Sequence, residues 1–327
     1  MPKVKPGIYS LRTSFGLRKW ISDQTLALSL GLTNTLYATL YLLPFLRLLG
    51  ARIGRWSEVS TVGHIDPDML ILGDESFVAD IAVVGTAVFY HGSVALMPVE
   101  VGCRSFVGNG ALVPGGFRMG DNSLLGVHSV PSQQIEKDTS WLGSPAIFLP
   151  RRQESQQFNE DEIYRPRPSL LAWRFFYEYL RITLPGTIMG ITLLAGFALT
   201  VYMARSLSPL ALLLLLPLAM TGIGIASTLL VALLKWLIVG KYRQRVEPLW
   251  SVFVRRSELI TGLYESIAVP ALLGMLTGTP WIAPVMRLFG IKIGKRVWMA
   301  TTFITEFDLV EIGDDAAIIH VPPDAPL

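Results

Sequence analysis

Residues 44–74 of this chain recur at 284–314, with a constant offset of 240 and no gap. The first copy opens with PFLRLLGARIG and the second with PVMRLFGIKIG, and Asp74 matches Asp314 in the same register. Because glycine, proline, arginine and aspartate all keep step, we interpret the two segments as one duplicated unit. Each copy holds an apolar stretch, a basic hinge and an Ile-Gly pattern. A chain with two such copies must build the same local structure twice.

Between Gly50 and Pro150 a six-residue period replaces ordinary strand alternation. An aliphatic residue is followed by a small one, and a further small residue comes three positions later. The examples are Ile53-Gly54 with Ser57, Leu72-Gly73 with Ser76, Val101-Gly102 with Ser105, Val107-Gly108 with Ala111, Met119-Gly120 with Ser123, and Leu125-Gly126 with Ser129. Consecutive hexads predict a left-handed parallel β-helix, with aliphatic residues stacked inside and small residues at the corners. A β-sandwich, the alternative, would lack the fixed period.

The apolar runs of the chain predict membrane segments. Hydrophobic residues make up 51% of the chain and charged residues only 16%, with a mean hydropathy of +0.47; soluble domains average about 25% charged. The runs Ile182–Met203 and Leu210–Ile238 have membrane-spanning length and a short link, which predicts a transmembrane helical hairpin. Basic residues flank both outer ends, so the positive-inside rule places these ends in the cytoplasm.

Two other apolar stretches, Leu26–Leu49 and Leu259–Phe289, do not have the pattern of single spanning helices. The second contains Pro270, Pro280 and Pro284, and proline removes a backbone donor and interrupts a helix. A single crossing would also place the two copies of the duplicated unit on opposite sides of the membrane. We therefore expect both stretches to be re-entrant or bent, and not single straight spanning helices.

The predicted fold class is mixed: α-helical membrane segments plus a left-handed parallel β-helix, internally duplicated. The second copy has room for about two coils before Leu327, so we expect residues 295–327 to be poorly ordered or packed as a cap, as in a truncated product of a longer gene. The predicted division is 1–49 N-terminal membrane-associated segment, 50–150 β-helix, 151–181 basic linker, 182–238 transmembrane hairpin, 239–258 basic cytoplasmic linker, 259–290 re-entrant or bent membrane segment, and 291–327 start of a second, truncated β-helix.

Several motifs carry a family resemblance over nearly the full chain. They are FVGNGA at 106–111, WLGSPA at 141–146 followed by LPRR, TGLYE at 261–265, and TT, TEFDL and IGDDA between 301 and 316. In these motifs the chain resembles the terminal membrane domain of nonribosomal peptide synthetases of the ε-poly-lysine synthetase kind, with hexapeptide-repeat acyltransferase-like modules. The resemblance implies modules that act on aminoacyl groups held by a phosphopantetheine carrier.

Histidines are the candidate catalytic residues, because acyl transfer needs a base and histidine titrates near neutral pH. His91 falls in a segment that interrupts the hexads, His64 precedes Asp66 by two residues, and His128 falls at an outward corner. The predicted catalytic set is His91, His64 and Asp66, with a surface histidine as the alternative for each. One cysteine, Cys103, and four histidines provide no metal cluster, so we expect no metal.

The predicted function is a membrane-bound acyl or aminoacyl transferase module that forms amide bonds from carrier-protein thioesters. The alternatives are a non-catalytic scaffold that anchors a peptide synthetase and an envelope glycan O-acetyltransferase. We expect no cofactor beyond phosphopantetheine on a partner protein or domain. The expected partners are membrane lipids, an aminoacyl carrier protein or synthetase, and a homo-oligomer, with no nucleic acid. The expected location is the bacterial inner membrane, multi-pass, with the β-helix module cytoplasmic.

Overall fold

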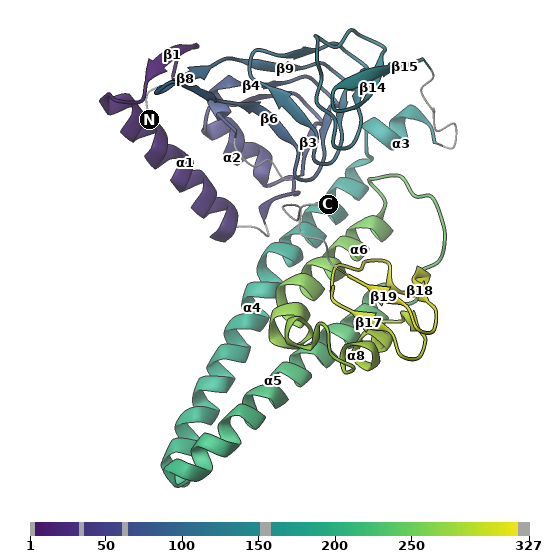
Figure 1. The fold of residues 1–327 in the computed structure, drawn as a ribbon. Coiled ribbons are helices and arrows are strands. Elements are labelled where there is room, and N and C mark those ends of the chain that lie inside the picture. Colours follow the sequence, from purple (N-terminus) through teal and green to yellow (C-terminus); the bar gives the residue numbers. More distant parts are fainter. Residues whose placement is uncertain (1–3, 33–35, 61–64, 151–157, 320–327) are drawn as a thin grey trace. The chain divides into compact units, whose positions relative to one another are not determined.

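A computed structural model of the chain describes residues 4–32, 36–60, 65–150 and 158–319 (Figure 1). The chain divides into two compact units, Met1–Arg165 and Pro166–Leu327. The first unit is built mainly of short parallel strands, and the second mainly of long helices followed by a few strands. Each unit is described in its own frame.

Short strands of the first unit pair in parallel in three sheets that the chain visits in turn. The first sheet holds β2 (Arg52–Ile53), β4 (Leu70–Leu72), β9 (Val99–Val101) and β12 (Arg118–Met119). The second holds β3 (Glu58–Val59), β5 (Phe77–Val78), β10 (Phe106–Val107), β13 (Leu124–Leu125) and β14 (Ser140–Gly143), closed by antiparallel β15 (Ala146–Leu149). The third pairs β6 (Val83–Thr86) with β11 (Leu112–Pro114). We call this stack of coils, residues 51–149, the coil domain.

The interior of the coil domain is a set of aliphatic columns. Val59, Val78, Val107 and Leu125 occupy the same position in successive coils of the second sheet, and each is at most 1% exposed. Buried serines turn the corners between sheets: the Ser57 hydroxyl donates to the Gly73 carbonyl of the next coil at 2.7 Å. The six-residue period thus reflects one inward aliphatic side chain per strand and one small residue per corner.

Glycine follows the inward residue because coils approach each other too closely for a side chain. A Cβ added to Gly102 would lie 2.6 Å from the backbone nitrogen of Asp121 on the next coil, and backbone cannot rotate away. We expect Gly102→Ala to lower the free energy of unfolding of the first unit by about 1–3 kcal/mol, the usual cost of overpacking. Urea unfolding of the full chain measures it.

The matched control for this prediction is Gly7→Ala in the same unit. The atoms nearest to a Cβ at Gly7 would belong to the Tyr9 side chain, at 3.6 Å or more, which is ordinary van der Waals contact. Alanine there is expected to be neutral or slightly stabilising, because glycine in a strand costs roughly 0.5–1 kcal/mol relative to alanine. Equal effects at Gly102 and Gly7 would contradict close coil stacking.

A small antiparallel sheet interrupts the coils. β7 (Val88–Tyr90) and β8 (Ser93–Leu96) form a hairpin, and β1 (Gly7–Ser10) pairs with β8. Helix α1 (Ser14–Leu32) follows β1, and the short helix α2 (Leu42–Leu48) precedes the first coil. Val94 and Leu96 of β8 are buried together with Met69, so the excursion has an apolar cluster of its own.

The second unit contains long apolar helices. They are α4 (Pro168–Ser206), α5 (Pro209–Ile238), α6 (Val252–Leu263) continued by the π-helix η3 (Tyr264–Leu273) and α7 (Gly274–Leu276), and then the short α8 (Ile282–Leu288). Among the residues that the structure describes, three helical stretches, Glu162–Ser206, Pro209–Ile238 and Val252–Leu276, are long and apolar enough to cross a membrane. The runs predicted as a hairpin lie in α4 and α5. The path of the later stretch through a membrane stays a prediction.

Strands return at the end of the second unit. β16 (Lys292–Ile293) pairs in parallel with β18 (Glu311–Ile312), and β17 (Trp298–Met299) with β19 (Ala317–Ile318), with the 3-10 turn η4 (Phe307–Leu309) between. Inward residues of this short coil pack on the helices, and Met299 and Phe307 are at most 1% exposed. The inward side chains of this short coil are thus covered by helices, whereas Trp298 and Phe303 are exposed. Residues 320–327 lie outside the described part.

The two segments related by the offset of 240 make matched contacts. The Arg47 guanidinium donates to the carbonyls of Ile53 and Gly54, and Arg287 makes the same bonds to Ile293 and Gly294. The Asp74 carboxylate caps the amide of Arg55 at 2.7 Å, as Asp314 caps that of Lys295 at 2.7 Å. Strand registers also coincide: Ile53 faces Leu72, and Ile293 faces Ile312.

Candidate functional site

His91 stands at the tip of the β7–β8 hairpin, the segment that leaves the coils. Its backbone has a left-handed φ of 44°, and its side chain is exposed. The imidazole lies edge-on to the ring of Tyr90, with 4.1 Å between ring centres. Tyr90 and Phe89 are 72% and 55% exposed, and the Tyr90 ring borders the imidazole. An approaching substrate can reach this imidazole from solvent.

Asp66 is held by the N-terminal helix. It precedes the 3-10 turn η2 (Pro67–Met69), and its carboxylate pairs with Lys19 of α1 at 3.0 Å. Lys19 also pairs with Asp23 at 2.5 Å and lies 6.0 Å from the ring centre of Phe89 on β7. Burial raises the pKa of the Asp66 carboxyl, and Lys19 opposes that rise only in part. Lys19 thus connects the turn at Asp66, helix α1 and the hairpin.

The predicted catalytic residues do not form one connected set among the described residues. His64 lies outside them, so its pairing with Asp66 stays a prediction. The described hydrogen bonds and ion pairs of Asp66 and His91 do not join these two residues; the Asp66 carboxylate goes to Lys19. His128, the third histidine considered, is exposed on a coil corner, where its amide donates to the Asn109 carbonyl at 2.8 Å. Sequence reasoning missed Lys19, since no local pattern connects it to Asp66.

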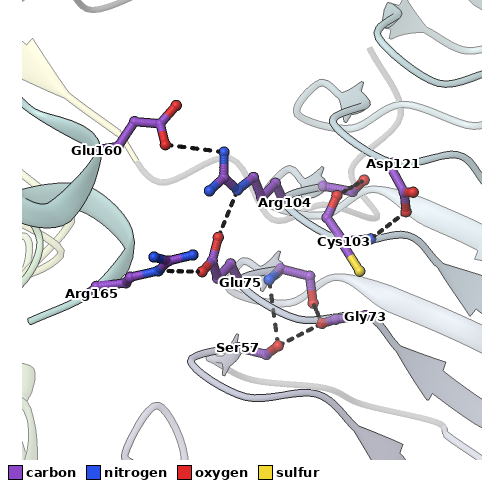
Figure 2. A network of polar contacts seen from close by, with 10 residues as sticks. Ser57, Gly73, Glu75, Cys103, Arg104, Asp121, Glu160 and Arg165 are labelled. Atoms are coloured by element: carbon purple, nitrogen blue, oxygen red, sulfur yellow. Dashed lines mark hydrogen bonds and ion pairs between the residues drawn. The ribbon is translucent and has the colours of Figure 1, made fainter.

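Metal-binding groups do not gather in the part of the chain that the structure describes. No group of three or more histidine, cysteine, aspartate or glutamate side chains is placed to hold an ion there. Cys103 is exposed at a coil corner, where its amide donates to Asp121 at 2.7 Å (Figure 2).

Glu75 and its partners connect successive coil corners to the segment that leaves the coil domain (Figure 2). The Glu75 carboxylate accepts hydrogen bonds from Arg104 Nε at 2.6 Å and from Arg165 Nε at 3.2 Å. Arg104 also pairs with Glu160 at 3.3 Å, and its guanidinium lies 4.8 Å from the ring centre of Tyr164. We call these five residues the Glu75 clasp. Burial by itself raises the pKa of Glu75, but the hydrogen bonds and charges of the two arginines outweigh burial and lower it.

The clasp gives a prediction about pH. Glu75→Gln is expected to lower the free energy of unfolding by roughly 1 kcal/mol at pH 7, since each partly exposed pair contributes about 0.2–1 kcal/mol. A carboxyl with a lowered folded pKa stabilises fully above its unfolded value of 4.5, and this contribution disappears as the pH falls through the folded value. Urea unfolding of both chains between pH 7 and pH 3 is the measurement.

The control for the clasp is Glu100→Gln, because Glu100 pairs with Arg118 at 3.3 Å in a largely exposed setting. That variant is expected to show little change at any pH. A deficit of Glu75→Gln that persists undiminished at pH 3 would contradict an electrostatic role for the clasp.

A second polar centre lies inside the second unit. Lys235 of α5 and Asp308 of η4 form an ion pair at 2.6 Å, with side chains 0% and 4% exposed, and the Tyr242 amide donates to the same carboxylate oxygen at 3.0 Å. Burial raises the pKa of the Tyr242 phenol. Nearby, the Tyr264 hydroxyl donates a hydrogen bond to the Thr302 carbonyl at 2.8 Å. These contacts fasten helices to the short coil.

Solved structures similar to part of the chain include several acetyltransferases, one of which is described as hexapeptide-repeat containing. A maltose O-acetyltransferase from Clostridium difficile 630 has a TM-score of 0.35 and 17% identity, covering 46% of this chain and 94% of its own. A hexapeptide-repeat acetyltransferase of Vibrio cholerae has a TM-score of 0.29 and 17% identity, covering 40% and 90%. Soybean serine acetyltransferase has a TM-score of 0.26 and 20% identity, covering 31% and 40%.

A named protein is similar in sequence to nearly the whole chain. Delta-poly-L-ornithine synthetase of Acinetobacter baumannii (strain AB307-0294) is 38% identical over 322 residues, which is 97% of this chain. The chain spans about a quarter of that protein's length, 24%. The likeness therefore runs through both units, helices and coils alike. No protein-family profile matches the sequence.

Proposed function

We propose that this chain is a membrane-bound aminoacyl transferase module that forms amide bonds from carrier-bound thioesters. The observation that carries the proposal is the 38% identity to Delta-poly-L-ornithine synthetase over 97% of the chain. A polymer of an amino acid grows by repeated amide formation. Similarity over nearly the whole chain therefore supports a role for the chain in that reaction. We propose that the substrate is ornithine or another diamino acid, and that the chain acts as a terminal domain of a peptide synthetase.

The chemistry needs few groups. An amine nitrogen attacks the thioester carbonyl, the C–N bond forms, the C–S bond breaks, and the pantetheine thiol leaves with a proton. His91 is the base that we assign to remove the amine proton, because it is exposed on the excursion from the coils and bordered by the Tyr90 ring. His64 with Asp66 remains the second predicted base. The thioester brings its own activation on the partner's phosphopantetheine, so the reaction draws on no further cofactor.

The architecture supports a membrane setting for this reaction. We propose that the coil domain is a left-handed parallel β-helix, that the segment 291–327 starts a second copy of the same unit, and that the coils lie on the cytoplasmic side. Matched contacts at the offset of 240 support the duplication. The three apolar helices and their basic flanks support insertion in a bacterial inner membrane.

The test uses the full chain in lipid nanodiscs with ornithine loaded on a pantetheinylated carrier protein. Free ornithine is added, and mass spectrometry follows the amide-linked dimer and the released carrier thiol. Chain-dependent dimer formation is the expected result. A chain that binds the loaded carrier without forming product above the chain-free control would contradict catalysis and favour the scaffold. Acetyl transfer to a glycan hydroxyl, without amide formation, would favour the O-acetyltransferase.

A further inference from the structure

An aspartate side chain lies against a glycine at two matched positions, one at the start of the coil domain and one at the start of the short coil in the second unit. Gly50 and Gly290 have left-handed φ values of 115° and 111°, and an added Cβ would lie 2.1 Å from Asp68 Oδ1 and 2.4 Å from Asp308 Oδ1. Asp68 and Asp308 are related by the offset of 240. The two carboxylates therefore occupy one structural position in two units.

In the second unit a helix end covers this position. Lys235 of α5 pairs with Asp308 at 2.6 Å, and the Tyr242 amide donates to the same oxygen at 3.0 Å. The indole of Trp236 donates to the Leu288 carbonyl at 2.8 Å. The side chains of Lys235 and Trp236 and the backbone amide of Tyr242 thus bind one surface. Phe289 beneath them is fully buried.

In the first unit the same surface is only partly covered. The Val4 amide donates to Asp68 Oδ2 at 3.3 Å, which is the bond that Tyr242 makes in the second unit. Within the described residues of this unit, no lysine or arginine pairs with Asp68. Leu48 is 87% exposed, against 44% for Leu288, and Leu49 is 38% exposed. Among the residues of this unit that the structure describes, the backbone donor is present, and a paired cation with its helix is not.

We propose that Leu48, Leu49 and Asp68 form a docking surface for an apolar helix of membrane length with a Lys-Trp pair in its last turn. The lysine complements the carboxylate, and the tryptophan complements the Leu48 carbonyl. A lipid surface fits poorly, because an anionic headgroup would face Asp68. The partner is thus a helix with the chemistry of the α5 end. This inference does not depend on the proposed aminoacyl transfer.

The test uses the full chain in nanodiscs with a photo-crosslinking residue at Leu48. The probe is a synthetic helix with the sequence of residues 209–242, which contains the Lys-Trp pair. Crosslinking at Leu48 is expected to exceed that at Ile147, an exposed position elsewhere on the coil domain, by about tenfold. A Lys235→Gln probe, or an Asp68→Asn chain, is expected to lose about tenfold in crosslinking, because a hydrogen bond between charged groups contributes more than a neutral one.

The charge swap keeps this test decisive if a single variant misfolds. An Asp68→Lys chain with a Lys235→Asp probe is expected to crosslink as the unchanged pair does. Crosslinking that is indifferent to the probe lysine, or labelling of Leu48 by a lipid probe alone, would overturn the proposal. Circular dichroism of each variant chain shows that it remains folded.

Discussion

A His91→Asn chain is expected to form the ornithine amide about 10²- to 10⁴-fold more slowly, the usual contribution of a positioned general base. Asparagine is the substitution of choice, because the residue has a φ of 44° and asparagine tolerates left-handed backbone. The variant removes the basic nitrogen and keeps the turn between β7 and β8. Single-turnover transfer from the loaded carrier measures the chemical step directly.

His128→Asn is the matched control, since His128 is also exposed and also left-handed, with a φ of 48°. It lies on a regular coil corner and is expected to keep the full rate. Unchanged carrier binding in both variants separates chemistry from recognition. Full activity of His91→Asn would remove His91 from the reaction and leave His64 with Asp66 as the predicted base.

A Lys235→Met chain is expected to lose about 3–5 kcal/mol of the stability of its second unit. Both side chains of the pair are almost fully buried, and removing one partner leaves the other charge without compensation. Asp308 would keep only the Tyr242 amide as a described donor. Denaturant unfolding in detergent, followed by the fluorescence of Trp236 beside the pair, measures the loss.

The double variant Lys235→Met with Asp308→Leu is expected to recover most of this stability, because apolar residues of similar volume can replace a buried pair at little cost. Lys292→Met serves as control: its pair with Glu311 has side chains 67% and 73% exposed, so about 0–1 kcal/mol is at stake. If Lys235→Met loses no more stability than Lys292→Met, the role assigned to the buried pair is contradicted.

The sequence determined the periodic part of this protein. Each hexad contributes one inward aliphatic residue, so the stacking of Val107 on Leu125, three hexads later, follows from spacing alone. Val78 pairs with Val107 across the β7–β8 excursion, and spacing does not determine that pairing. The offset of 240 likewise anticipated the matched arginine and aspartate contacts. Long uncharged runs indicated α4 and α5, because only helices satisfy the backbone within a span of that apolarity.

Only the tertiary structure decided which distant charges meet. Glu75 meets Arg165 across 90 residues and Lys235 meets Asp308 across 73. Lys19 pairs with the Asp66 carboxylate, although no local sequence pattern connects these two residues. The β1–β8–β7 sheet and the π-helix at Tyr264–Leu273 were also not predicted. The physical reason is common to all: repeats and apolar runs are read from local spacing, whereas ion pairs and excursions depend on where packing brings separate elements together.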